Sequence, residues 1–318
     1  MLSSFFHRAD AAENEATRWL LDRGKHMPVA IRNLFFKITG ALVLLAVWAK
    51  HRLMGYRKPN TVSEDDRNAR IGYVHDVVQS WLRFLPADVS VRGCSVLELG
   101  PGSSLATGSL LLAHGAASYT AVDAFRLAGD ETADFRRDAV LRFDGALQED
   151  DVRVAEAANG GASDIFRYHV DPGFDIPALC GEQTFDLILS CAAFEHFDAI
   201  ENTIDGLTKV AKSGCVSLHI VDLQTHTNAI RERDPNNIYR FSPWFYSLLA
   251  FPGQPNRKRP VDYVRAFERN GWKDIQVIAA KSIPPEKRSL LTSGLAARFD
   301  SSEMEMHILD LVIISRYP

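Results

Sequence analysis

Apolar residues in this chain gather in short runs that end at turns, which is the pattern of strands buried on both faces of a sheet. The clearest run, Ser95–Leu99, leads into the turn Gly100-Pro101-Gly102. Apolar residues at helical spacing occupy 70–85, ahead of it. Strand, glycine turn and helix open a doubly wound α/β domain. Further strands are predicted at 118–123, 166–170, 185–190, 215–221, 274–278 and 306–314.

The first 69 residues follow a different pattern and are predicted to form a basic, apolar helical segment with a linker. The run Ile38–Ala49 carries no charge, and Lys50, His51 and Arg52 follow it. A membrane-spanning helix needs about 20 apolar residues, so this run is short for spanning. With Trp19 and Trp48 it suits peripheral contact with an anionic membrane. The competing interpretation is a helix packed on the rest of the chain or on the second subunit of a homodimer.

Composition narrows the class of protein. The chain has 318 residues, 46% of them hydrophobic and 24% charged, which is enough for one large domain with an appendage. We place that domain at 70–318. A net charge of −4 argues against a nucleic-acid partner. The four cysteines are scattered, without the pairs typical of metal sites, and predict buried thiols and a cytoplasmic location.

Candidate chemistry lies where the predicted strands end. Two glycines in the turn after Leu99 let the backbone approach a ligand closely, although an ordinary tight turn explains them equally well. Asp123 ends the next strand, where doubly wound nucleotide binders place a carboxylate on ribose hydroxyls. A nicotinamide-binding motif requires a third glycine at the position of Leu105, which disfavours an oxidoreductase.

Four segments carry a family resemblance: Val96–Gly102, Val122-Asp123, Phe185–Ile188 and Phe194–Phe197. In this order and spacing they resemble class I S-adenosylmethionine-dependent methyltransferases of the bacterial small-molecule group. The resemblance implies a Rossmann-like, mostly parallel sheet closed by an antiparallel pair, with S-adenosylmethionine as cofactor. It also implies methyl transfer to a small molecule, with a sugar or lipid-linked glycan precursor as one acceptor class. The alternative is an inactive cofactor-binding module that acts as a partner subunit.

The resemblance also assigns cofactor residues. Glu98 would orient the glycine turn or the amino acid end of the cofactor, and Asp123 would accept the ribose hydroxyls. Phe125 would pack on adenine or simply belong to the core. An acid after the third strand would meet the adenine amino group, and Asp171 and Asp175 are both candidates. The full expected set is Glu98, Gly100, Pro101, Gly102, Asp123, Ala124, Phe125, Asp171 and Ser190.

Three residues are candidates for catalysis. His196 suits a general base, or else caps a helix in a Glu-His pair. Asp222 and His226 lie four apart, with His219 nearby, and share one face if the segment is helical; a solvated loop is the alternative. Related methylases that bind a metal beside such a Glu-His pair place an acid where this chain has Ala192, so no metal is expected.

A lid insertion is expected at 222–262. A bacterial subgroup has a similar order there, with an aromatic lid and then Asn256-Arg257 ahead of a helix that ends at Gly271-Trp272. Arginines in such a lid suit an anionic or polyhydroxylated acceptor. The candidate lid residues are Tyr239, Arg240, Trp244, Tyr246 and Arg257.

Overall fold

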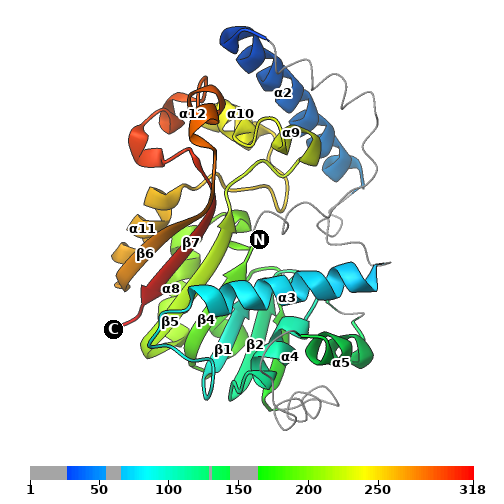
Figure 1. The fold of residues 1–318 in the computed structure, drawn as a ribbon, viewed down its shortest axis with the longest axis vertical. Coiled ribbons are helices and arrows are strands. Elements are labelled where there is room, and N and C mark those ends of the chain that lie inside the picture. Colours follow the sequence, from blue (N-terminus) through cyan, green and yellow to red (C-terminus); the bar gives the residue numbers. More distant parts are fainter. Residues whose placement is uncertain (1–26, 55–65, 129–130, 144–163) are drawn as a thin grey trace.

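Seven strands form one sheet in the order β3-β2-β1-β4-β5-β7-β6 (Figure 1). The computed structural model describes residues 27–54, 66–128, 131–143 and 164–318. The first five strands are parallel, and β7 runs antiparallel to both β5 and β6. This is the Rossmann-like fold expected from the sequence, including its antiparallel closing pair. The strands are β1 Ser95–Leu99, β2 Ser118–Asp123, β3 Phe166–Val170, β4 Phe185–Cys191, β5 Ala211–Asp222, β6 Lys273–Ser282 and β7 Ile308–Arg316.

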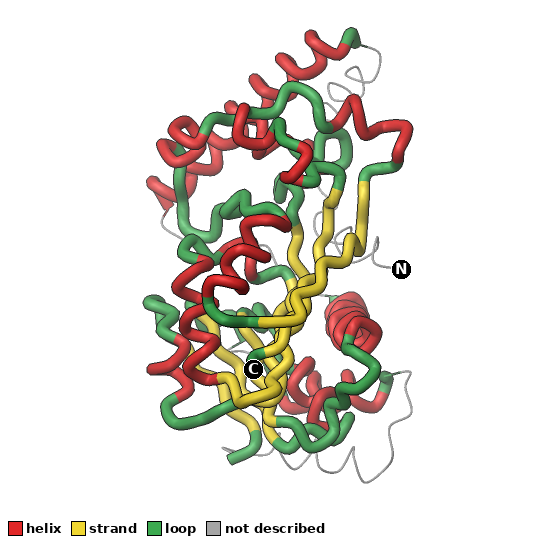
Figure 2. Tube along the Cα trace, turned by 90° about the vertical axis from the view of Figure 1, so that its left-hand side faces the viewer, coloured by secondary structure: helices red, strands yellow, loops and turns green. Residues whose placement is uncertain are grey.

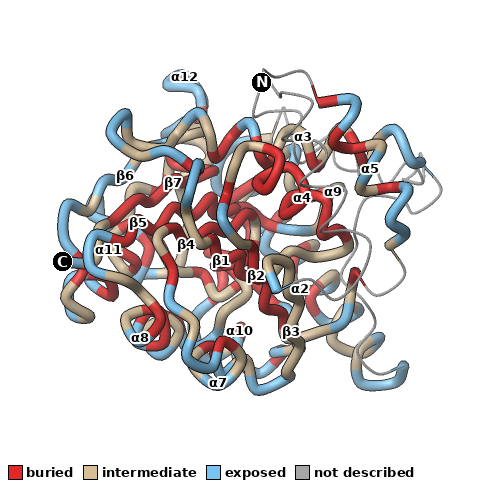
Figure 3. The backbone as a smooth tube through the Cα atoms, turned by 90° about the horizontal axis from the view of Figure 1, so that it is seen from below, coloured by how far each residue is buried: buried red, intermediate tan, exposed pale blue. Residues whose placement is uncertain are grey.

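Helices cover both faces of the sheet (Figure 2). Alternate residues of β4 serve the two faces: Leu187 and Leu189 join one apolar core, and Ile188 joins the other. The inner strands are therefore buried on both sides, as their colouring in Figure 3 shows, whereas the edge strands β3 and β6 are partly exposed. The first core is closed by α3 Arg67–Phe84, α4 Ala106–Ala113 and α5 Ala133–Leu141, and the second by α7 Ile176–Cys180, α8 Ile200–Val210 and α11 Pro260–Arg269.

Helix α3 confirms the helix predicted at 70–85. Asp66 caps its first turn by accepting a hydrogen bond from the Ala69 backbone N–H. Trp81 is fully buried on its inner face and donates its ring N–H to the Ser190 carbonyl at 3.1 Å. The periodic apolar positions therefore fix which face of α3 packs on the sheet.

A cap lies over the carboxyl ends of the parallel strands (Figure 1). We define the cap as residues 223–259 and 283–307, so that the β6–β7 connection joins the expected insertion. Inside it, Arg240 forms two hydrogen bonds with the buried Asp234, at 2.7 and 2.8 Å, and a third with the Ser293 carbonyl at 2.8 Å. Its helical elements are α9 Asn228–Arg231, η4 Asn237–Arg240, α10 Pro243–Leu248, α12 Pro285–Leu291, η5 Ala297–Phe299 and η6 Ser302–Met304.

Helix α2, Val29–Met54, lies against this cap and is longer than the uncharged run suggested. Its 26 residues give a length of about 39 Å, and its length and composition would allow it to cross a membrane. One face is held by the protein: Arg32 donates to the Arg233 carbonyl at 2.7 Å, and Asn237 donates to the Phe36 carbonyl at 2.8 Å. The expected interfacial residue Trp19 lies outside the described residues.

Candidate functional site

The glycine turn after β1 combines tight packing with open space. Gly100 and Gly102 both have positive φ, 64° and 70°, which favours glycine. A Cβ on Gly100 would lie 2.9 Å from the Ala193 side chain, whereas a Cβ on Gly102 would meet no atom of the described residues within 4 Å. Gly100 therefore lets the turn pack against the segment after β4. Gly102 leaves room for a ligand to approach the backbone.

Glu98 supports this turn from below. Its side chain is buried, and one carboxylate oxygen accepts hydrogen bonds from Thr107 Oγ1 at 2.7 Å and from the Tyr119 hydroxyl at 2.6 Å. Burial raises the pKa of Glu98 to about 7, and these two hydrogen bonds offset part of the shift. Glu98 thus ties β1 to α4 and β2 directly below the glycine turn.

Asp123 lies beside the turn, at the end of the adjacent strand. Gly100 donates its N–H to the Val122 carbonyl at 2.9 Å, and Asp123 Oδ1 accepts from the Phe125 N–H at 3.1 Å. Burial raises the pKa of Asp123 to about 6, partly offset by the backbone N–H groups of Phe125, Gly102 and Ala124. The carboxylate is therefore ionised at neutral pH and positioned as a hydrogen-bond acceptor next to the open turn.

The two candidate acids after β3 have different surroundings. Asp175 caps α7 by accepting from the Ala178 N–H at 3.2 Å. Asp171 lies directly beyond β3, and its N–H donates to the Asp123 carbonyl at 3.0 Å. The structure therefore brings Asp171, rather than Asp175, next to Asp123. Half-buried Pro101, Ala124 and Phe125 lie along the same edge.

Ser190 lies deeper in the sheet than the other expected cofactor residues. It is fully buried, and its hydroxyl hydrogen bonds to His219 Nδ1 at 2.8 Å. His219 stacks on Phe194 with ring centroids 3.8 Å apart, and burial lowers its pKa to about 3. Both side chains are therefore part of the core, where His219 is neutral.

A second group of polar residues lies at the β4–β5 end of the sheet. Glu195 and His196 belong to η3, Phe194–His196, and His226 reaches them from the loop after β5. Glu195 is 2% exposed, and neither carboxylate oxygen has a hydrogen-bond partner among the described residues. His226 Nε2 lies 3.9 Å from Glu195 Oε1, and the two imidazole rings are 4.9 Å apart.

Backbone carbonyls orient both histidines. His196 Nδ1 is 2.7 Å from the Gly253 carbonyl oxygen, and His226 Nδ1 is 3.0 Å from that of Gln224. A carbonyl oxygen can only accept, so each Nδ1 carries a hydrogen and donates, which leaves Nε2 as the nitrogen of each ring that faces the other side chains. Burial, helped by His226, lowers the pKa of His196 to about 4. His196 is therefore neutral at physiological pH and a weaker base than an ordinary histidine.

Asn256 fixes the turn that carries Glu195 and His196. Its backbone N–H donates to the Glu195 carbonyl at 2.7 Å. Its side-chain amide donates to the carbonyls of Phe194 at 2.8 Å and Phe197 at 3.0 Å. The sequence marked Asn256 only as part of a motif and gave Glu195 no role of its own. The signal in the sequence that could have identified Glu195 is its position shortly after a buried strand, where a polar side chain lies at the carboxyl edge of the sheet.

Asp222 and His226 do not share a helical face: of the two expected arrangements the structure has the loop, although Leu223 to Thr225 in it are buried rather than solvated. It ends strand β5, and residues 223–227 form a loop. Its carboxylate pairs with Arg231 at 2.5 Å and accepts from the Gln224 N–H at 2.9 Å. A helix would stack side chains four residues apart on one face, one turn from each other, but the loop after Asp222 has no such repeat. Of the residues proposed for catalysis, only His196 and His226 are adjacent.

The cap arginines bind the protein itself. Arg257 donates to the carbonyls of Ile238 at 3.2 Å and Phe241 at 2.7 Å, and its guanidinium lies over the Tyr246 ring at 3.9 Å. Arg240 is held by Asp234, as described above. These buried contacts stabilise the cap, which corrects the expectation that the arginines contact an acceptor. Trp244, in contrast, is 71% exposed.

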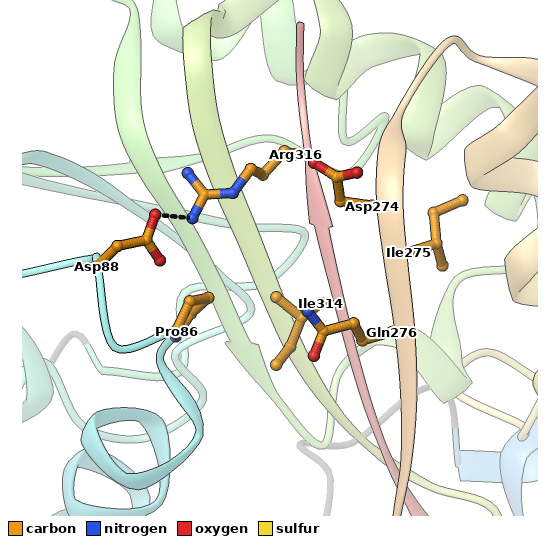
Figure 4. Close-up of a pocket in the computed structure, with 7 residues that line it drawn as sticks. All are labelled: Pro86, Asp88, Asp274, Ile275, Gln276, Ile314 and Arg316. Carbon is orange, nitrogen blue, oxygen red and sulfur yellow. Dashed lines mark hydrogen bonds and ion pairs between the residues drawn. The ribbon is translucent and has the colours of Figure 1, made fainter.

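A hollow of about 430 Å³ lies elsewhere on the molecule (Figure 4). Arg316 in its wall pairs with Val216 in the sheet register, whereas Asp222 lies at the other end of β5. The hollow is therefore at the amino end of the parallel strands, opposite the glycine turn. None of the predicted site residues is among those that line it: Pro86, Asp88, Asp274, Ile275, Gln276, Ile314 and Arg316.

No known protein family and no curated protein matches the chain in sequence. Solved structures resemble it at low identity. A Mesorhizobium loti S-adenosylmethionine-dependent methyltransferase is 15% identical with a TM-score of 0.42, over 79% of this chain and 100% of that one. The Synechocystis magnesium protoporphyrin IX methyltransferase is 14% identical with a TM-score of 0.41, over 89% of this chain and 100% of that one. A Haemonchus contortus phosphoethanolamine N-methyltransferase is 13% identical with a TM-score of 0.43, over 76% of this chain and 52% of that one. At such values the function has to be argued from the site itself.

Proposed function

We propose that this protein transfers a methyl group from S-adenosylmethionine to a small-molecule acceptor. The observation that carries the proposal is the open backbone at Gly102 beside the buried Asp123 carboxyl group on the neighbouring strand. Ligands of doubly wound sheets bind at the carboxyl ends of the strands, and a carboxylate there suits vicinal ribose hydroxyls. The motif resemblance from the sequence agrees with this placement.

The cofactor would supply an electrophilic methyl group on a sulfonium. The protein then has to hold the acceptor atom in line with the methyl carbon at about 3–3.5 Å. The acceptor atom forms the new bond to the methyl carbon and gives up its proton, while the electron pair of the broken bond stays on sulfur. Ala193 packs against Gly100 and lies two residues before Glu195, which supports the Glu195, His196 and His226 group as the one that faces the acceptor.

Calorimetric titration with S-adenosylhomocysteine tests cofactor binding. Replacing Asp123 by Ala removes a charge-assisted hydrogen-bond acceptor, a loss of about 1.5–3 kcal/mol, so affinity should fall at least about tenfold. Asp205→Ala, which removes an exposed carboxylate on α8, is the matched control and should bind normally. Unchanged affinity in folded Asp123→Ala would contradict the proposal. Binding without methyl turnover in a cell extract would favour the inactive module.

We further propose that α2 attaches the enzyme peripherally to an anionic membrane. Its outer face is apolar, whereas monomeric proteins rarely expose large contiguous apolar patches. Exposed basic residues on the same helix add attraction to anionic lipid of about 1 kcal/mol each. The apolar stripe is Ile31, Leu34, Ile38, Leu42 and Leu45, and the basic residues are Lys37, Lys50 and Arg52.

The contacts of α2 favour an interfacial helix over a spanning one. Arg32 and Phe36 hold its first half to the cap, and Gly40 packs so closely on Asn237 that a Cβ would lie 2.0 Å from its side-chain oxygen. At the other end, His51 stacks on Phe251 with centroids 4.7 Å apart. A helix tied along its length to polar protein groups has only its outer face for lipid.

The same end of α2 leads to the candidate site. Phe251 lies two residues before Gly253, whose carbonyl holds His196. Docking of α2 on a bilayer would therefore place the site near the membrane surface. This supports an acceptor that is itself anchored in the membrane, such as a lipid-linked sugar.

Flotation with vesicles containing anionic lipid tests the membrane proposal. Full-length protein should float at low salt, and Leu34→Glu/Leu42→Glu should remain in the soluble fraction. Leu141→Glu, at an equally exposed leucine on α5, is the control and should float like the unmodified protein. If the unmodified protein stays soluble, or forms a dimer that Leu34→Glu/Leu42→Glu abolishes, the stripe is a subunit interface instead.

A further inference from the structure

The carboxylate of Glu195 is buried without hydrogen bonds that would offset the cost of removing it from water. Both oxygens lack a hydrogen-bond partner among the described residues, although buried polar groups are normally satisfied. The side chain is 2% exposed, so solvent does not supply the missing partners. An acid in such surroundings gains most from a positively charged ligand.

Two imidazoles face the same space. With Nδ1 of His196 donating to Gly253 and Nδ1 of His226 donating to Gln224, both Nε2 lone pairs are available as ligands. Backbone carbonyls that hold the distal nitrogen are the usual support of a metal-bound histidine. Asn256 supplies further support by fixing the turn that carries Glu195 and His196. Hydrogen bonds from surrounding residues thus hold the candidate ligands in place.

We propose that Glu195, His196 and His226 bind a divalent first-row transition-metal ion, with Zn²⁺ as the reference metal. Their ligand atoms all lie within 4.8 Å of one another. Bonds of about 2.0–2.2 Å would bring the donors to roughly 3.3 Å apart, so the site has to contract slightly. His226 is exposed on a loop and provides that freedom.

The donor set determines which metals fit. Two imidazoles and one carboxylate suit zinc, iron or cobalt, whereas magnesium and calcium prefer oxygen ligands. The sequence predicted no metal because Ala192 replaces an acid near the Glu-His pair. His226, which reaches the site from the loop after β5, instead supplies a third ligand that the motif does not contain.

Three protein ligands leave coordination positions open for water or an acceptor oxygen, as in catalytic metal sites. Ala193 packs against Gly100 and is two residues from Glu195, so these residues would hold the metal close to the glycine turn. This use of the metal rests on the proposed function, whereas metal binding itself does not.

Metal titration of the full-length protein, stripped with a chelator and then freed of it, tests the site. By calorimetry Zn²⁺ should bind at one site that is lost in Glu195→Gln/His226→Ala, and Mg²⁺ should not compete for it. Co²⁺ should give visible absorption bands of imidazole coordination that weaken in His196→Ala. His169→Ala, on β3, is the control histidine and should bind Zn²⁺ as the unmodified protein does.

Affinity for Zn²⁺ should fall at least about tenfold in each single-ligand variant. Equal Zn²⁺ binding by the unmodified protein and Glu195→Gln/His226→Ala would overturn the inference, as would no binding at all. S-adenosylhomocysteine binding is measured on the same metal-free samples. Intact binding of that ligand without Zn²⁺ binding overturns the metal site alone, and the reverse result overturns the proposed function alone.

Discussion

Two buried glutamates at the carboxyl edge of one sheet have opposite surroundings. Glu98, in β1, accepts hydrogen bonds from Thr107 and Tyr119. Glu195, which follows β4, is equally buried and has no hydrogen-bond partner among the described residues. In the β1–β2 half of the edge the buried glutamate is therefore satisfied by the protein itself. The backbone of the glycine turn and the Asp123 carboxylate remain available to a ligand. The β4–β5 half contains a buried carboxylate whose oxygens have no hydrogen-bond partner among the described residues, and this difference is the basis of the metal-site proposal.

Truncating both glutamates should give the largest contrast. Glu98→Ala leaves the Tyr119 and Thr107 hydroxyls buried without their acceptor, so the free energy of unfolding should fall by about 3 kcal/mol or more. Glu195→Ala removes a carboxylate that makes no hydrogen bond, so the loss should stay below about 1 kcal/mol. Denaturant unfolding of the metal-free protein measures both. Equal losses would show that Glu195 is satisfied in solution.

Replacing the two glycines of the turn should also have unequal effects on stability, with the larger loss at the tightly packed Gly100. Gly100→Ala adds a contact at 2.9 Å with Ala193 to the strain of positive φ, and should cost about 2–3 kcal/mol of stability. Gly102→Ala adds only the backbone strain, about 1–2 kcal/mol, but places a methyl in the open space. Thermal unfolding and S-adenosylhomocysteine titration together separate these effects. A larger stability loss in Gly102→Ala would contradict the assignment.

Cofactor affinity should depend on pH through Asp123. Its carboxylate is the acceptor form and has a pKa of about 6, so binding should be strongest above pH 6. Affinity should fall as the pH drops through 6, by up to about tenfold per pH unit. Titrations between pH 5 and 8 measure the profile, which Asp123→Asn should flatten. Affinity that increases towards acid pH would exclude this role.

Asn256→Ala should produce the smallest effect and should be confined to the β4–β5 half. Without its side chain the Phe194 and Phe197 carbonyls lose their donor, and the Glu195-His196 turn loosens. Zn²⁺ affinity should fall by about tenfold, the range typical of residues that support metal ligands, while S-adenosylhomocysteine affinity stays unchanged. Paired titrations measure both ligands. Weaker binding of both Zn²⁺ and S-adenosylhomocysteine would mean that Asn256 stabilises the whole carboxyl edge of the sheet.

The sequence alone determined the features that depend on local pattern. Apolar runs buried on both faces marked the strands, and the spacing from Ile71 to Leu85 marked α3. The glycine turn and Asp123 could be placed because consecutive parallel strands end at the same edge. The uncharged run 38–49 located α2 but underestimated its length, because charged residues such as Arg32 continue the helix where the cap binds them.

Only the tertiary structure decided which polar side chains meet. Asp222 and His226 are close in sequence, yet the end of β5 directs Asp222 to Arg231 and the following loop carries His226 to Glu195. The sequence predicts that the lid arginines contact the acceptor, but Arg240 and Arg257 bind buried groups of the cap. Such partners come from elements that local periodicity does not connect. Strand register and cap packing bring them together, because the cost of burying an unpaired charge selects among distant partners.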